Sequence, residues 1–320
     1  MTESDGGNVR IVYRSHAGEN AKNRPGYYSK HIALLSLLRS AHGLRDPEIV
    51  FLNDGPIPGA RGALMAERGE VVTIAAGSNR ASYRAAVARE AAGAGEAGPE
   101  LVWFAEDDYL YRPEALPALV AGAATVSDAD YFSLYGSEAV DAAAPRTAPR
   151  PRALPGAEGD PAAVATGDVT WYRAFSTTST FGVRRRVLAQ DARLLRLCPL
   201  TGGAWDHTTS LVLQGLSPFT PAELAADLTG RGGAGGARSV LRGLARSVLA
   251  ARALRRPARR RVLLGSDPEL VRHLELPTPH PRTPASPATQ GFDWEALAGE
   301  TIAWAQARGL PVPAVDGAAR

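Results

Sequence analysis

Roughly the first hundred residues alternate between two hydrophobic periods. Short runs rich in Val, Ile and Phe, which are typical of buried strands, are separated by longer segments with apolar residues at helical spacing. Strands are predicted at residues 9–15, 48–52, 70–75 and 101–105, and helices at 27–42 and 78–92. This order predicts a Rossmann-like α/β fold, in which a mostly parallel sheet has helices on both faces.

Acidic residues follow two of these strands. Asp54 follows the second strand, and Glu106, Asp107 and Asp108 follow the fourth. The carboxyl ends of parallel strands meet at one edge of a sheet, where such folds bind ligands. We therefore expect these carboxylates to share a site with the turn after the first strand.

Three consecutive carboxylates can also form a solvated turn or cap the following helix. That helix is predicted to begin at Pro113, so its cap would be Arg112 and not a carboxylate several residues earlier. Neighbouring carboxylates repel one another, and a hard divalent cation binds their oxygens together with those of a substrate phosphate. The cluster therefore predicts a site for Mn²⁺ or Mg²⁺.

The composition limits the class of protein. A chain of 320 residues, of which 45% are hydrophobic, can bury a sizeable core as one domain or as a domain with an appended subdomain. The single cysteine, the polar first residues and the lack of an apolar run of about 20 residues predict a cytoplasmic protein, at most peripheral to a membrane. The basic residues are arginines apart from Lys22 and Lys30, which we interpret as coding bias. The chain has no dinucleotide-binding glycine motif after its first strand and no P-loop motif, which argues against an oxidoreductase or a P-loop hydrolase.

These features resemble the nucleotide-sugar-dependent glycosyltransferases with the A-type fold, particularly family-2-like enzymes, over about two-thirds of the chain. The metal-binding Asp-x-Asp motif of that family occurs in variants that include Glu-Asp-Asp, the order found at residues 106–108. The resemblance implies that Asp108 binds the metal directly. Glu106 and Asp107 would contact the sugar or ribose, or orient metal-bound water.

The resemblance also implies a nucleotide site at the end of the first strand and beside the helix at 78–92. Asp54 would meet the base, although Asn-Asp-Gly-Pro at 53–56 departs from the usual Asp-Asp-Gly-Ser. Arginines near the diphosphate, among them Arg80, would add positive charge, or would be solvated. The implied donor-binding residues are Tyr13, Arg14, Ser15, Asp54, Asn79 and Arg84.

The family places a catalytic base after the metal motif, beside aromatic residues at the start of a helix. Asp206, in Gly-Ala-Trp-Asp-His, fits as the general base of an inverting reaction, and His207 is an alternative. Asp206 also has the pattern of an N-cap for a helix at 207–214 that is closed by Gly215. The two roles are compatible.

Two further segments resemble parts of the family's site. The strand-like residues 166–183 would lie on the acceptor side, where Trp171 and, further on, Trp205 would bind sugar, unless Trp171 is simply core. The preceding residues 142–167 read as a long loop, either a lid or an insertion. The family often adds a carboxyl-terminal histidine to the metal or diphosphate, and we favour His280 over His273.

Residues 231–261 contain ten arginines and no acidic residue. Arg238, Arg242 and Arg246 recur at helical spacing, with Leu241, Leu244 and Val248 on the other side, which predicts a basic amphipathic helix. It could contact an anionic membrane or a lipid-phosphate acceptor through residues 238–261, or pack on the catalytic domain. A net charge of +3 and the scarcity of aromatic residues in this segment argue against a nucleic-acid partner.

We therefore expect a catalytic α/β domain at residues 1–228, a basic segment at 229–262 and a helical carboxyl-terminal segment at 263–320. The expected reaction is metal-dependent, inverting transfer of a sugar from a nucleotide donor to a sugar, lipid-linked or small-molecule acceptor. Two alternatives stay open: sugar-phosphate nucleotidyltransfer, and a non-catalytic adaptor that binds membranes or nucleic acid.

Overall fold

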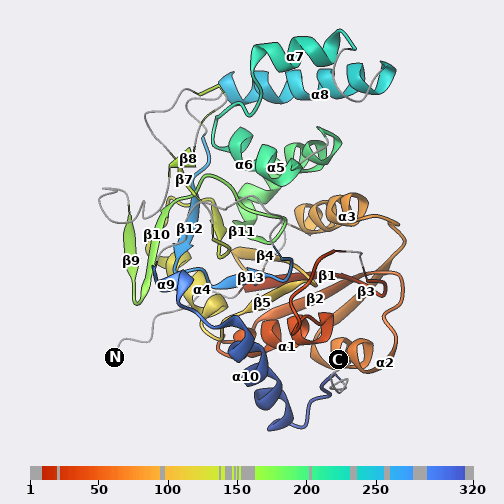
Figure 1. The fold of residues 1–320 in the computed structure, drawn as a ribbon, viewed down its shortest axis with the longest axis vertical. Helices are drawn as coiled ribbons and strands as arrows, with labels where there is room; N and C mark the ends of the chain where they lie inside the picture. The colour runs from red at the N-terminus through yellow and green to blue at the C-terminus, as the bar shows by residue number, and fades with distance from the viewer. Residues whose placement is uncertain are drawn as a thin grey trace.

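A computed structural model describes residues 9–19, 22–93, 98–136, 138–140, 146–147, 149, 151–152, 163–201, 204–230, 236–255, 260–276 and 287–313. Within these residues, nine strands form one sheet in the order β3-β2-β1-β4-β11-β6-β12-β10-β9 (Figure 1). They are β1 (Val9–His16), β2 (Glu48–Asp54), β3 (Glu70–Ile74), β4 (Leu101–Glu106), β6 (Tyr131–Ser133), β9 (Val164–Thr166), β10 (Val169–Arg173), β11 (Phe181–Arg184) and β12 (Leu263–Asp267). Two small sheets pair β5 (Tyr109–Tyr111) with β13 (Val271–His273), and β7 (Ala139–Val140) with β8 (Pro151–Arg152).

The sheet is parallel in its first half and mixed in its second. β1 pairs in parallel with β2 and β4, and β2 with β3, as the alternating sequence predicted. β11 then runs antiparallel to β4 and β6, while β12 is parallel to β6 and antiparallel to β10. The α/β prediction is confirmed, and the sheet is a large mixed one.

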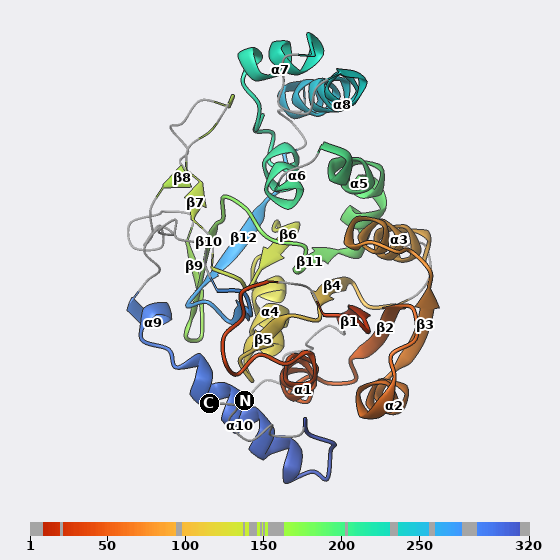
Figure 2. The same ribbon diagram turned by 45° about the vertical axis from the view of Figure 1, so that its right-hand side comes forward.

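Helices cover both faces of the sheet (Figures 1 and 2). One face carries α1 (Lys30–Ala41), α2 (Gly59–Arg68) and α4 (Ala115–Thr125), and α10 (Trp294–Gln306) packs on α1. The other carries α3 (Asn79–Ala92), α5 (Arg185–Leu197) and α6 (Trp205–Leu213), followed outward by α8 (Gly236–Arg255) and α7 (Pro221–Leu228). The short helices are η2 (Cys198–Thr201) and α9 (Pro287–Gln290).

The central strand β1 shows why both faces must be covered. Ile11 and Tyr13 point into one core cluster, shared with α1, α2 and α4, and Val12 points into the other, shared with α3, α5 and α6. A strand buried on both faces reads as a continuous apolar run, which is the pattern that predicted it. Apart from Arg10, the strand is apolar up to Tyr13, and it becomes polar from Arg14 onward.

The structure differs from the predicted elements in its second half. Residues 166–183 hold not one strand but parts of three, because Gly167, with φ 59°, turns the chain between β9 and β10. The helix predicted from Pro113 begins at Ala115 and is preceded by β5. The carboxyl-terminal segment supplies β12, which lies inside the large sheet between β6 and β10.

Candidate active site

A cleft of about 1110 Å³ opens at the carboxyl ends of β1, β2 and β4. It is also lined by the start of α3, by the start of α6 and by β13 with the residues after it. The predicted site residues that line the cleft are Arg14, Ser15, Asp54, Asn79, Glu106, Asp107, Asp108, Trp205 and Asp206. Sequence segments as distant as 14 and 206 thus meet in one place.

Each carboxylate of the acidic cluster contacts a cationic side chain of the protein. Arg14 Nη2 donates to Glu106 Oε1 at 2.7 Å, and Arg24 Nη2 lies 3.1 Å from Asp108 Oδ2. Lys30 Nζ lies 3.0 Å from Asp107 Oδ2. The repulsion expected between adjacent carboxylates is therefore reduced by the protein itself.

Asp107 is the most enclosed of the three carboxylates. Its Oδ2 accepts hydrogen bonds from Ser15 Oγ at 2.7 Å and from the backbone N–H of His16 at 3.2 Å, in addition to its contact with Lys30. Lys30 Nζ also donates to the carbonyl oxygens of His16 and Gly18. Asp107 therefore fixes the turn after β1 to the turn after β4.

The cluster contains two carboxyl groups whose pKa values shift in opposite directions. Burial raises the pKa of Glu106, although Arg14 opposes the shift. Burial would also raise the pKa of Asp108, but the hydrogen bond to His273 and the charges of His273, Arg24 and Lys22 outweigh it, so the pKa falls below its usual range. Asp108 is therefore held as the ionised carboxylate.

His273 reaches Asp108 through the pairing of β13 with β5, in which His273 lies opposite Tyr109. Its ring stacks on Tyr109 with centroids 4.7 Å apart, and its Nε2 lies 3.2 Å from Asp108 Oδ2. His280, which we favoured from the sequence, lies outside the described residues. The less favoured histidine, His273, thus lies beside the acidic cluster, and the register of two three-residue strands could not be predicted from the sequence.

Both lysines of the chain lie at this site, which sequence reasoning missed. Lys30 contacts Asp107, and Lys22 lines the cleft and pairs with Glu275 Oε2 at 2.5 Å. The retention of lysine at two positions in a chain with 34 arginines was an available signal. A compact ammonium group fits among carbonyl oxygens where a planar guanidinium does not.

Asp54 and Asn79, which both line the cleft, hold neighbouring parts of its wall in place. Asp54 Oδ1 accepts hydrogen bonds from the N–H groups of Ala76 and Gly77, which orders the loop before α3. Asn79 Oδ1 accepts from Arg14 Nη1 at 2.9 Å. The Arg14 guanidinium is therefore held between Asn79 and Glu106.

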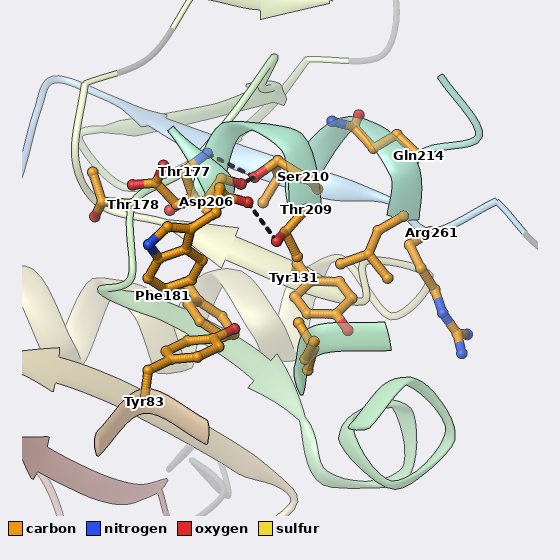
Figure 3. A pocket seen from close by; sticks show the side chains of 14 residues that line it. Tyr83, Tyr131, Thr177, Thr178, Phe181, Asp206, Thr209, Ser210, Gln214 and Arg261 are labelled. Carbon is orange, nitrogen blue, oxygen red and sulfur yellow. Dashed lines mark hydrogen bonds between the residues drawn. The ribbon is translucent and has the colours of Figure 1, made fainter. Parts of the chain in front are cut away.

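Asp206 lies in the first turn of α6, between the polar cleft and a small apolar pocket of about 20 Å³ (Figure 3). The helix begins at Trp205 with Ala204 as its cap residue, so the N-cap prediction for Asp206 is wrong. Its Oδ1 instead accepts from the N–H of His207 at 2.9 Å. Burial raises the pKa of Asp206, and burial lowers the pKa of His207. Gly215, with φ 76°, follows the end of the helix as predicted.

Three predicted site residues that the structure describes do not line the cleft. Tyr13 points from β1 into the core, and Arg84 lies further along α3. Trp171 is wholly buried in β10, with its ring 5.8 Å from that of Phe132 in an edge-on arrangement. Trp171 is therefore a core residue, as the alternative interpretation of this strand predicted, and it is not part of the site.

A divalent cation at this site would have few protein ligands among the described residues. Asp108 and His273 offer a carboxylate oxygen and an imidazole nitrogen, both of which line the cleft. Among the described residues, no group of three His, Cys, Asp or Glu side chains is arranged to hold a metal. Mg²⁺ commonly binds one or two protein ligands and takes its remaining oxygens from water and substrate phosphates.

No protein-family model and no curated protein matches this sequence. Among solved structures, it is similar to S. aureus TarS 1–349 in complex with UDP-GlcNAc, with 14% identity over 63% of this chain and 52% of that chain, at a TM-score of 0.38. It is also similar to glucosyl-3-phosphoglycerate synthase from Mycobacterium tuberculosis in complex with Mn²⁺, uridine-diphosphate and phosphoglyceric acid, with 17% identity over 40% of this chain and 43% of that chain, at a TM-score of 0.27.

A third similar structure is the CMP:2-keto-3-deoxy-manno-octonic acid synthetase complexed with CTP, with 14% identity over 64% of this chain and 83% of that chain, at a TM-score of 0.35. The chain spans about half the length of the TarS chain that it matches. At these identities the likeness concerns the fold alone.

Proposed function

We propose that this protein is a metal-dependent transferase that moves a sugar from a nucleotide donor to an acceptor hydroxyl or amine, with inversion at the sugar carbon. The observation that carries the proposal is a single cleft that combines the acidic cluster after β4 with a separate carboxylate, Asp206, at the start of α6. The part of the cleft at the acidic cluster would bind the diphosphate of the donor. The part at α6 would supply Asp206 as the proton acceptor.

In the proposed reaction, Asp206 accepts the proton of the acceptor group while the acceptor oxygen or nitrogen bonds to the anomeric carbon. The bond from that carbon to the diphosphate oxygen breaks, and its electron pair leaves with the nucleoside diphosphate. Asp108 and His273 would hold a Mn²⁺ or Mg²⁺ ion, which supplies Lewis-acid stabilisation of the departing charge. Lys22 and Arg24, which both act on Asp108, would add fixed positive charge there.

The remaining cleft residues divide between donor and acceptor. Asp54 would recognise the base, while Arg14, Ser15 and Asn79 would bind the nucleotide at the end of β1. Glu106 and Asp107 would meet the sugar or ribose, although the enclosure of Asp107 by Lys30 and Ser15 favours a role in shaping the turn. Trp205, which packs on Tyr83 with ring centroids 4.5 Å apart, would border the acceptor. The acceptor would be a sugar, a lipid-linked sugar or a small molecule.

Sugar-phosphate nucleotidyltransfer is the second candidate, and one observation favours it. That class is expected to have a Gly-rich loop with Arg and Lys after its first strand. Residues 9–24 lack such a loop, but Lys22, Arg24 and Lys30 lie beside Asp107 and Asp108 or act on them. The two reactions differ in their products. A nucleotidyltransferase releases pyrophosphate from a nucleoside triphosphate, whereas the proposed transferase releases a nucleoside diphosphate.

The proposal is tested by donor binding and turnover with the full chain. UDP-GlcNAc, UDP-glucose, their GDP counterparts and CTP are screened by thermal shift with Mn²⁺, with Mg²⁺ and with a chelator. We expect at least one nucleotide sugar to raise the melting temperature only when a metal is present, because ligand that binds only the folded state stabilises it. The same donor should be hydrolysed slowly to a nucleoside diphosphate without an acceptor.

Asp108→Asn should abolish the metal-dependent shift and turnover, and Asp128→Asn, which changes an exposed carboxylate outside the cleft, should alter neither. Full metal-stimulated activity in Asp108→Asn would contradict the proposed metal site. Pyrophosphate release from CTP with a sugar phosphate would favour the second candidate. If no nucleotide binds in the presence of either metal, the result would favour the alternative of a non-catalytic adaptor.

A further inference from the structure

Three apolar side chains of α8 are exposed to solvent, and two of its arginines face the protein. Leu241, Leu244 and Val248 are 66%, 52% and 49% exposed. Arg242 and Arg246 instead face α7, where they pair with the two oxygens of Asp227 at 2.6 Å and 2.8 Å. The basic face predicted from the sequence is therefore partly used inside the molecule.

The rotation of α8 about its axis is set by its packing on the body. Leu249, Ala250 and Ala253 are buried in the core cluster shared with α5 and α6. Gly243 lies against α7, where a Cβ would come within 3.0 Å of Asp227. Because these small and apolar residues occupy the inner side, the opposite side of the helix must face solvent.

The outer side of α8 concentrates exposed apolar surface. Among the described residues, eight large hydrophobic side chains are exposed, and four of them are on this one helix: Leu241, Leu244, Val248 and Leu254. The first three are spaced by three and four residues, so they form one stripe. A contiguous exposed apolar stripe marks an interaction surface more often than isolated exposed residues do.

The charge around the stripe indicates what it contacts. Arg238, Arg252 and Arg255 are exposed beside the stripe or at its ends, and α8 contains no acidic residue. Two copies of this helix packed along the stripe would bring these arginines together, which like-charge repulsion opposes. An anionic surface would instead complement them. Among the described residues, no helix is both long and apolar enough to cross a bilayer.

We propose that α8 is a docking helix for an anionic phospholipid bilayer. It would lie in the membrane interface with Leu241, Leu244 and Val248 among the acyl chains, while Arg238, Arg252 and Arg255 contact lipid phosphates. The α7–α8 pair forms the end of the molecule opposite α10 (Figures 1 and 2), so the helix is available to a surface without rearrangement of the sheet. Membrane docking through α8 involves no residue of the cleft and is independent of the reaction that the cleft performs.

The test is co-sedimentation of the full chain with vesicles of phosphatidylcholine, with and without phosphatidylglycerol. We expect binding that is at least roughly tenfold tighter to the anionic vesicles and that weakens as salt is raised. The triple variant Leu241→Gln, Leu244→Gln and Val248→Gln should lose roughly tenfold or more of that binding. The matched control is Val71→Gln, because Val71 is 41% exposed on β3, away from α8.

A second triple variant tests the charges. Arg238→Gln, Arg252→Gln and Arg255→Gln should remove the preference for anionic vesicles, while the same change at three exposed arginines elsewhere, Arg45, Arg68 and Arg186, should leave it. All substituted side chains are exposed, so each variant should keep the melting temperature of the wild type. Thermal unfolding of each variant therefore checks directly that it is folded.

Three results would overturn the proposal. The first is no preference of the wild-type chain for anionic vesicles. The second is vesicle binding by the apolar triple variant equal to that of the wild type. The third is a dimer, seen by sedimentation velocity without lipid and lost in the apolar variant, which would assign the stripe to a second copy of the chain.

Discussion

Lys30 is a buried cation whose positive charge compensates the buried carboxylate of Asp107. Its side chain is almost fully enclosed, and its ammonium group contacts one carboxylate oxygen and two carbonyl oxygens of the turn after β1. Removing one partner of a buried ion pair leaves the other charge uncompensated, which costs more than the pair contributes in net stability.

Lys30→Met should therefore lower the free energy of unfolding by about 3 kcal/mol. Lys22→Met, the matched change in the chain's only other lysine, should cost less than about 1 kcal/mol because its pair with Glu275 is exposed. Urea denaturation measures both. The double variant Lys30→Met with Asp107→Asn should recover part of the loss, and additive losses would show that the pair is not coupled.

Asp206→Asn should reduce the rate of sugar transfer about a hundredfold or more and leave donor binding unchanged, because an amide cannot accept the acceptor's proton. His207→Asn is the matched control, since the two side chains are neighbours in the first turn of α6. Steady-state kinetics and donor titration separate the effects. Parallel loss of transfer and donor binding in Asp206→Asn would instead indicate a structural role.

The pH dependence of transfer follows from the shifted pKa of Asp206. Only the ionised carboxylate accepts a proton, so the rate falls as pH decreases through the pKa of the folded protein. Because burial raises that pKa, the acidic limb should lie at higher pH than for an exposed aspartate, and it should be absent from the residual rate of Asp206→Asn. A limb retained in Asp206→Asn but lost in His207→Asn would assign the base to His207.

At the scale of elements, α4 approaches the sheet closely because it has a glycine where the indole of Trp171 lies. A Cβ at Gly122 would overlap the Trp171 ring, which fills the space between α4 and β10. Among the described residues, no surrounding atom comes within 4 Å of a Cβ built at Gly299, in the interior of α10. The two glycines therefore have the same helical context but different surroundings.

Gly299→Ala should raise the free energy of unfolding by about 0.5–1 kcal/mol, because alanine loses less backbone entropy in a helix. Gly122→Ala should lower the free energy of unfolding by about 1–3 kcal/mol, because the cost of overpacking against Trp171 exceeds the gain in backbone entropy. Equilibrium denaturation compares the two variants directly. An increase in stability from Gly122→Ala would mean that the ring can move aside at little cost.

At the scale of the whole molecule, the catalytic domain predicted at residues 1–228 lacks a strand of its own sheet. β12 lies between β6 and β10, and it contributes Leu263 to one core cluster and Leu264 to the other. A chain that ends at residue 228 would leave both neighbouring strands with unpaired backbone groups in the interior.

We expect the fragment of residues 1–228 to lack a cooperative thermal transition and the near-ultraviolet circular dichroism of packed aromatic rings. A chain of residues 1–313, which keeps every described element, should unfold like the full chain. Cooperative unfolding of the shorter fragment would show instead that the first 228 residues fold independently of β12.

The sequence alone determined the first half of the fold and the location of the acidic cluster. The strands β1 to β4 were predicted from short apolar runs, and helical spacing predicted α1 and α3 but not α2. Parallel strands joined by helices place Asp54 and residues 106–108 at one edge. Local patterns also predicted α3 and the end of α6 before Gly215.

Tertiary structure alone decided which residues complete the site. His273 reaches Asp108 through the pairing of two three-residue strands, and Lys30 reaches Asp107 through the packing of α1 against the sheet. It also decided which face of α8 is exposed, since buried residues at one end of the helix set its rotation and turn Arg242 and Arg246 toward Asp227. Hydrophobic periodicity describes one element at a time, whereas register, rotation and ion pairing depend on partners far away in the chain, which no local pattern encodes.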